Sequence, residues 1–214
     1  MTRYDSRQFW GNQGFTHSKD ETALKRKGWV ADVMDAQERI LPQLVIAIQP
    51  KSVLEVGCGY GRMTKLIRSV SSVERYLALD LSAERIQEAR RDVPNVEYRE
   101  RDFGDAAISE KFDLVFACQV LMHIEPPQIA NFIRAMKRCS KMYVLNLDYY
   151  AHTWTQRHSL KNFTLTQLHS GVFNHNYFKL YADEWLTRVT RIPLKNLKTG
   201  QTYPQSIFHG RVTR

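Results

Sequence analysis

The fold of this chain is decided by the stretch Val53-Leu-Glu-Val-Gly-Cys-Gly-Tyr-Gly-Arg62. It joins a short apolar run, 52–56, to a helical pattern over 63–70, and glycines stand between them at positions 57, 59 and 61. Glycine lets the backbone turn sharply and lets a ligand come close, because no Cβ is in the way. We therefore predict a strand, a tight turn and a helix, with a bound ligand near exposed backbone N–H groups at the start of the helix.

Strand-like and helical patterns alternate on both sides of this turn. Helical patterns cover 35–49, 83–92 and 126–140, and Ser82 caps the second of them. Strand-like runs cover 52–56, 76–80, 96–100, 112–118 and 141–147, and a pair, 185–194 and 203–212, follows near the end. Such alternation indicates an α/β fold: a doubly wound, mostly parallel sheet with helices on both faces, closed by a C-terminal antiparallel hairpin.

The spacing of the glycines separates this turn from two common nucleotide-binding turns. A dinucleotide-binding turn has the pattern G-x-G-x-x-G, but the sixth position counted from Gly57 is Arg62. The phosphate-binding pattern G-x-x-x-x-G-K-[ST] is absent from this stretch as well. A variant of the dinucleotide motif that ends on a basic residue stays open as a less favoured interpretation.

Polar residues follow the next three predicted strands, whose carboxyl ends meet at one edge of a parallel sheet. Asp80 comes 19 residues after Gly61, which is about the interval of an acidic residue that accepts hydrogen bonds from ribose hydroxyls. Asp102 and Phe103 follow the third strand, where they can accept from an adenine amino group and pack on the base. Gln119 follows the fourth strand and faces the same crevice. Each residue alone has a local explanation, but the ordered set indicates one adenosyl-type ligand.

These motifs as a set resemble the class I S-adenosylmethionine-dependent methyltransferases over residues 36–148. The matching stretches are Val53–Gly61, Leu79-Asp-Leu-Ser82, Arg101-Asp-Phe103 and Phe112–Ile124. The resemblance implies a Rossmann-like sheet of seven strands and S-adenosylmethionine as the cofactor. It also implies the cofactor contacts: Glu55 at the amino-acid end beside Gly57, Cys58, Gly59 and Gly61, Asp80 and Leu81 at the ribose, Asp102 and Phe103 at the adenine, and Gln119 nearby.

A narrower similarity connects the chain with methylases of sugar and surface-glycan biosynthesis. It rests on Phe9-Trp-Gly-Asn-Gln-Gly14, on Leu121-Met-His-Ile124 and on the tyrosines after the fifth strand. Leu145-Asn-Leu-Asp148 departs from the acidic residue expected in that strand. The similarity implies a small-molecule or glycan acceptor.

Residues after the fourth and fifth strands are candidates for the chemistry of the acceptor. His123 lies near the expected position of the methyl group, and its titration range suits a general base. The alternative is a histidine that caps the next helix. Tyr150 is the second catalytic candidate, and Tyr149 and His152 are expected to line the acceptor pocket. His175 either covers the site or starts the following helix.

The length of 214 residues suits a single domain, 1–214. Its first part, 1–34, is polar and aromatic, and forms either a lid over the cofactor or a strap on the outer face of the sheet. Residues 149–180 interrupt the alternation of strands and helices, so we expect an insertion on the substrate side.

The charge and composition of the chain limit the classes of partner and the cellular compartment that we expect. The formal net charge is +9, and residues 150–214 carry +7 of it. A localised positive region favours an anionic partner, such as a phosphorylated metabolite, an acidic glycan or nucleic acid, or else it solubilises the surface. The three scattered cysteines indicate neither a disulfide framework nor a metal site. Without a membrane-spanning run or a signal pattern, we expect a cytoplasmic protein.

Three functions agree with these features. The leading hypothesis is a methyltransferase that acts on a small-molecule or glycan acceptor and methylates oxygen. The second is an RNA or DNA methyltransferase that uses the basic C-terminal third as its footprint, although no N/D-P-P-Y/F-like tetrapeptide follows the fourth strand. The third is a cofactor-binding subunit without turnover. Nothing in the sequence predicts the oligomeric state.

Overall fold

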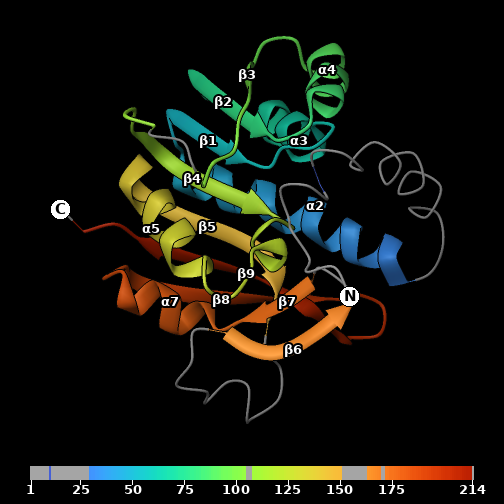
Figure 1. The fold of residues 1–214 in the computed structure, drawn as a ribbon. Coiled ribbons are helices and arrows are strands. Elements are labelled where there is room, and N and C mark those ends of the chain that lie inside the picture. Colours follow the sequence, from blue (N-terminus) through green and yellow to red (C-terminus); the bar gives the residue numbers. More distant parts are fainter. Residues whose placement is uncertain (1–9, 11–28, 105–107, 151–162, 170–171, 214) are drawn as a thin grey trace.

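The computed structural model describes residue 10 and residues 29–104, 108–150, 163–169 and 172–213. At its centre is a seven-stranded sheet with the order β3-β2-β1-β4-β5-β9-β8 (Figure 1). The strands from β3 to β5 pair in parallel, whereas β9 is antiparallel to both of its neighbours. The strand bounds are β1 Ser52–Val56, β2 Arg75–Asp80, β3 Glu97–Glu100, β4 Phe112–Cys118, β5 Ser140–Tyr149, β8 Thr187–Lys195 and β9 Thr202–Arg211. The predicted doubly wound sheet and its antiparallel end are confirmed.

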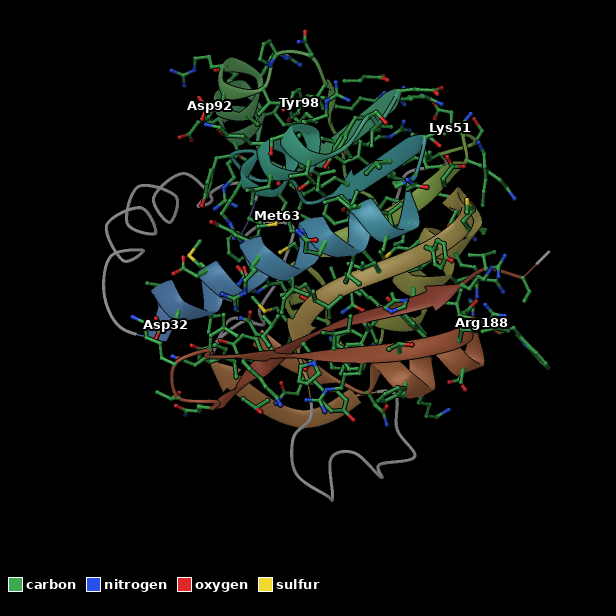
Figure 2. The ribbon with its side chains drawn as sticks, turned by 180° about the vertical axis from the view of Figure 1, so that it is seen from behind. Asp32, Lys51, Met63, Asp92, Tyr98 and Arg188 are labelled. Carbon is green, nitrogen blue, oxygen red and sulfur yellow. The ribbon has the colours of Figure 1, made fainter. Side chains whose placement is uncertain are left out.

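Helices cover both faces of the sheet. On the face that Figure 2 shows in front lie α2 (Trp29–Ile48), α3 (Arg62–Val70) and α4 (Ala83–Asp92), and on the other lie α5 (Ile129–Cys139) and α7 (Tyr177–Asp183). Successive side chains of a strand point to opposite faces. Val53 therefore joins the core under α2, and its neighbour Leu54 joins the core under α5. Burial on both faces explains why the central strands are continuous apolar runs in the sequence.

Three elements begin two or more residues away from the predicted start. The helix α2 begins at Trp29, so the last residues of the predicted N-terminal segment 1–34 belong to it. The helix α5 begins at Ile129 instead of residue 126, because a proline at 127 disfavours helical backbone at the preceding residue. The strand β8 begins at Thr187 instead of residue 185, and Trp185, with a φ of +58°, precedes it.

The predicted insertion 149–180 contains regular structure. β6 (Phe163–His169) and β7 (Val172–His175) form a separate antiparallel pair, and Asn176 then caps α7 by accepting from the N–H of Lys179 at 3.1 Å. β7 lies against η1 (Leu121–His123), the short 3₁₀ helix after β4. The insertion is thus anchored beside the carboxyl ends of β4 and β5, which is where ligands bind in open α/β sheets.

None of the helices within the described ranges is both long enough and apolar enough to cross a membrane.

Candidate functional site

The turn after β1 requires glycine at three positions, for different reasons. Gly57, Gly59 and Gly61 have φ values of +71°, +55° and +85°, a region that L side chains rarely adopt. A Cβ on Gly57 would lie 2.4 Å from Val120 Cγ2, and one on Gly61 would lie 3.0 Å from a side chain of α4. A Cβ on Gly59 would meet only Arg85 Nη1, at 3.8 Å. Gly57 and Gly61 therefore permit close packing, and Gly59 leaves the crest of the turn open to a ligand.

The amides of this turn donate inside the protein, which corrects the expectation of exposed N–H groups. The N–H groups of residues 57 and 58 both donate to Leu79 O at 2.8 Å, and that of residue 59 donates to Asp80 Oδ2 at 2.7 Å. The N–H of Gly61 donates to Cys58 O at 3.0 Å. These hydrogen bonds thus connect the turn to the end of β2. A ligand cannot be recognised by free amides at these four positions.

Asp80 lies at the end of β2, half-buried, with both carboxylate oxygens engaged. Its Oδ2 accepts from the N–H of Gly59 at 2.7 Å, and its Oδ1 accepts from the N–H of Ser82 at 3.0 Å. Since each carboxylate oxygen can accept more than one hydrogen bond, acceptor capacity remains for hydroxyl groups. Leu81 follows directly and is half-buried. The structure therefore adds a structural role to Asp80 beside its predicted ribose contact.

Glu55 is only 2% exposed and lies under the turn on the face covered by α2 and α3. Its Oε2 accepts hydrogen bonds from Thr64 Oγ1 at 2.6 Å and from the Tyr76 hydroxyl at 2.7 Å. Burial raises the pKa of Glu55 to about 7, although these two hydroxyls and the charge of Arg62 act in the opposite direction. Sequence reasoning found Glu55 but missed Thr64 and Tyr76, because single hydroxyls on a helix and a strand form no local pattern.

Asp102 and Phe103 follow β3, as predicted, but they differ in exposure. Asp102 is half-buried, and its Oδ1 accepts from the N–H of Gly104 at 2.7 Å. Phe103 is 4% exposed, and its ring centroid lies 5.0 Å from that of Phe132 on α5. The Phe103 ring therefore packs in the core under α5, and Asp102 is the accessible member of the pair.

A chain of amide side chains crosses the carboxyl end of β4, and no pattern in the sequence predicted it. Gln205 Oε1 accepts from Gln37 Nε2 at 2.5 Å and from Gln119 Nε2 at 3.4 Å. Gln37 Oε1 in turn accepts from Arg62 at 2.7 Å. Gln37 and Gln205 are buried on α2 and β9, which lie far apart in the sequence. Only the tertiary fold brings them to Gln119, one of the predicted cofactor residues.

His123 ends η1 and is half-buried beside the N-terminal segment. The ring centroids of His123 and Trp10 are 4.6 Å apart, and the guanidinium of Arg85 lies over the Trp10 ring at 5.2 Å. Trp10 thus contacts both Arg85, near the start of α4, and His123 of η1. Whether segment 1–34 forms a lid or a strap stays a prediction, because residues 1–9 and 11–28 lie outside the described residues. Phe9 and Phe15 lie outside the described residues.

Two predicted acceptor residues lie in the protein interior, which corrects their assignment. Tyr150 is 3% exposed; its ring centroid is 5.0 Å from that of Phe208, and the Arg191 guanidinium is 4.4 Å from it. His175 has no exposed surface, and its Nε2 lies 3.1 Å from the carbonyl oxygens of Leu121 and Ile124. The His175 side chain therefore packs against the η1 segment, and the Tyr150 ring, in the core, packs on Phe208 and Phe178.

Tyr149 is the predicted acceptor residue that stays half-buried at the end of β5. Burial raises the pKa of its hydroxyl, against the opposing effect of a hydrogen bond with Gln205. Tyr149 therefore joins the amide chain described above. His152 lies outside the described residues.

No group of three or more His, Cys, Asp or Glu side chains able to hold a metal ion occurs among the residues that the structure describes.

Comparison with known proteins shows which family the chain resembles around this site. Residues 53–142 match the family described as "Methyltransferase domain". The Invertebrate iridescent virus 6 protein named "Putative methyltransferase 235L" is 30% identical over 112 residues, which are 51% of this chain and 42% of that protein. Residues 53–142 form a methyltransferase domain.

A second relative is the trans-aconitate 2-methyltransferase of Azoarcus sp. (strain BH72), 34% identical over 70 residues, which are 33% of this chain and 28% of that enzyme. The chain spans less than half the length of either relative. The fold of the methyltransferase domain extends further than the sequence likeness. Magnesium protoporphyrin IX methyltransferase from Synechocystis PCC 6803, solved with bound SAM, superposes with a TM-score of 0.67 at 13% identity over 100% of both chains.

Proposed function

We propose that this chain transfers a methyl group from S-adenosylmethionine to an oxygen atom of a small-molecule or glycan acceptor. The observation that carries the proposal is the glycine turn. Its packing requires Gly57 and Gly61, and it is held by Asp80; among the described residues, the atom nearest to a Cβ built on Gly59 is Arg85 Nη1, at 3.8 Å. A turn built only for stability would not need an open glycine at its crest, because an αL glycine costs conformational entropy.

The residues present fit an adenosyl cofactor. Asp80 keeps acceptor capacity for ribose hydroxyls, and Asp102 is the accessible acceptor after β3. Gln119, with a φ of +59°, closes the same crevice after β4. The cofactor supplies a methyl group on a sulfonium, which an acceptor displaces in line. The task of the protein is then to hold both molecules in position and to exclude water.

The acceptor side supports oxygen as the atom methylated. Hydroxyl acceptors benefit from a general base, and His123 is the imidazole beside the crevice. Tyr149 and Gln119 add neutral hydrogen-bonding groups, which suit a hydroxyl-rich molecule. An imidazole after β4, together with a phenol and an amide at neighbouring strand ends, is thus the kind of set that can orient an alcohol and remove its proton.

The described cations of the last third are divided between the two ends of the sheet. Figure 2 shows Arg188 at the end of the molecule where Lys51 lies, while Asp32 marks the opposite end. Lys195 ends β8 on the side of Asp32, and the Arg191 guanidinium lies 4.4 Å from the centre of the Tyr150 ring. The distribution of charge therefore leaves the nucleic-acid methyltransferase as the alternative that the acceptor assay has to test.

Calorimetry with S-adenosylhomocysteine tests cofactor binding, using two glycine variants. We expect Gly59→Val to weaken binding at least about 30-fold, since the side chain fills the open crest. The matched control is Gly200→Ala: Gly200 also has a positive φ, +71°, but lies in the β8–β9 turn with open space around it. It should bind at the parental affinity. No affinity in the parent protein would refute the proposal.

Methyl transfer is tested with S-adenosylmethionine carrying a labelled methyl group, offered with neutral glycans, acidic glycans, small alcohols and RNA in parallel. Label in a hydroxyl-bearing acceptor supports the proposal, and label in RNA overturns the acceptor class. Binding without transfer to any acceptor would favour the cofactor-binding subunit. His123→Gln should lower the transfer rate most below neutral pH, and a parental rate across pH 6–9 would remove His123 as the base.

A further inference from the structure

Asp148 is a buried acid that neither the sequence motifs nor the proposed function explains. It lies in β5 with no exposed surface. Its Oδ1 accepts from the N–H of Met122 at 3.2 Å, and the backbone N–H groups of Val120 and Leu121 also bond to the carboxylate. Its Oδ2 accepts from Asn146 Nδ2 at 2.9 Å. Three successive amides of the segment after β4 therefore converge on one carboxyl group.

His175 contacts the same segment from the insertion. Its Nε2 lies 3.1 Å from both Leu121 O and Ile124 O, and carbonyl oxygens only accept hydrogen bonds. Nε2 must therefore carry the hydrogen, which it shares between the two carbonyls. Burial lowers the pKa of His175 to about 4, so the ring is neutral at pH 7 and Nδ1 carries no hydrogen.

The segment held in this way is 119–124, which follows β4 at the carboxyl end of the sheet. It begins at Gln119 in the left-handed region and contains His123, whose ring meets Trp10. Between them, Val120 lies so close to the glycine turn that a Cβ on Gly57 would be 2.4 Å from Cγ2. A shift of the segment would therefore move the proposed base and disturb the turn that holds the cofactor.

We propose that Asp148 and His175 are positioning residues, which hold segment 119–124 in place. Asp148 accepts hydrogen bonds from the amides of the segment, and His175 donates to its carbonyl oxygens. The inference rests on the proposed function, because the purpose of the positioning is to hold His123 beside the cofactor. Neither residue touches the reacting atoms. The pair works by hydrogen-bond geometry: a carboxyl oxygen satisfies amides that a turn leaves unpaired, and one ring N–H satisfies two carbonyls.

Hydrogen exchange read by mass spectrometry tests the inference without any ligand. In Asp148→Leu, which has a similar shape but no acceptor, amide exchange over 119–124 should rise at least about 10-fold. Asp148→Asn keeps one carbonyl oxygen and should restore most of the protection. His175→Leu should raise exchange over the same peptide, and His175→Gln, which retains an N–H donor near Nε2, should restore it.

Tyr181→Phe is the matched control on the same network. The Tyr181 hydroxyl donates to Asn146 Oδ1 at 2.8 Å, one link beyond Asp148. It should leave exchange over 119–124 at the parental level. Equal protection in the parent, Asp148→Leu and His175→Leu, all folded by circular dichroism, would overturn the inference, and so would a failure of both conservative variants to rescue.

Calorimetry separates this inference from the proposed function. In Asp148→Leu, S-adenosylhomocysteine should bind about 3–10-fold more weakly, because Val120 no longer supports the glycine turn, and Asp148→Asn should recover the affinity. If the parent binds no S-adenosylhomocysteine, the proposed function fails, whereas the exchange result still decides the positioning role. If the parent binds and Asp148→Leu binds equally well, the positioning role fails and the proposed function stands.

Discussion

The turn after β1 and the turn after β4 share one feature, a buried carboxyl group, but different hydrogen-bond donors contact it. Each stands over a buried carboxyl group whose pKa burial raises to about 7: Glu55 under the first turn and Asp148 under the second. Glu55 accepts from two side-chain hydroxyls, whereas Asp148 accepts from successive main-chain amides. A hydroxyl rotates to another partner, but a main-chain amide cannot. The second turn therefore depends on its carboxyl group more strongly.

The largest expected effect comes from removing the two carboxyl groups. Asp148→Leu should lower the free energy of unfolding by about 3–5 kcal/mol, because each buried donor left unsatisfied costs about 1–3 kcal/mol. Glu55→Leu should cost about 1–2 kcal/mol, since the hydroxyls of Thr64 and Tyr76 can turn to other acceptors. Urea unfolding of both variants at pH 8 measures the difference. Equal losses would contradict the contrast between the two turns.

The contact between the turns should give the next largest effect. Gly57→Ala places a Cβ 2.4 Å from Val120 Cγ2 at a φ of +71°, and should lower the free energy of unfolding by about 2–4 kcal/mol. Adding Val120→Ala removes the clashing methyl group and should recover about 1 kcal/mol or more. A double-mutant cycle by urea unfolding measures this coupling. Strictly additive losses would show that the two turns are independent.

The smallest effect, taken per pH unit, is a change of stability with pH. The folded protein holds the Glu55 proton with a pKa of about 7 against an ordinary value of 4.5, so this stability is present at low pH and lost as pH rises to 7. The free energy of unfolding of Glu55→Gln should therefore rise, relative to that of the parent, by up to about 1.4 kcal/mol per pH unit between pH 5 and 7.

The comparison has to be made against the parent at each pH. The contribution of Asp148 to the free energy of unfolding falls as pH rises, as that of Glu55 does. His175 has a pKa lowered to about 4, so its contribution falls as pH drops below 6.5. These two contributions are common to the parent and to Glu55→Gln, so they cancel in the difference. Urea unfolding at pH 5, 6, 7 and 8 measures it, and a constant difference would mean that Glu55 titrates normally in the folded state.

The first turn could be predicted from the sequence, and the second could not. Gly57, Gly59, Gly61 and Asp80 were identified because a strand, a turn and an acid after the next strand are local patterns with a fixed order. Asp148 was missed because it lies inside an apolar strand and its partners are main-chain amides, which every sequence contains. Its binding partners depend on the path of the chain and not on residue type.

His175 and Tyr150 show the same limit from the other direction. Their residue types suit an acceptor pocket, but both side chains are buried: His175 lies against η1, and Tyr150, which bridges to His175 of β7, packs on Phe208. Gln37 and Gln205 were missed because their contact spans 168 positions of the sequence. Polarity predicts that a residue needs a partner, but not which one it finds.

The sequence by itself determined the order of strands and helices, the glycine turn and the acid at the end of β2, because these follow from periodicity, backbone freedom and short-range spacing. Only the tertiary structure decided which acids are buried, which polar groups meet across the crevice, and how segment 119–124 is held. The physical reason is that burial and hydrogen-bond pairing are properties of neighbours in space, and the neighbours of a strand end come from every part of the chain.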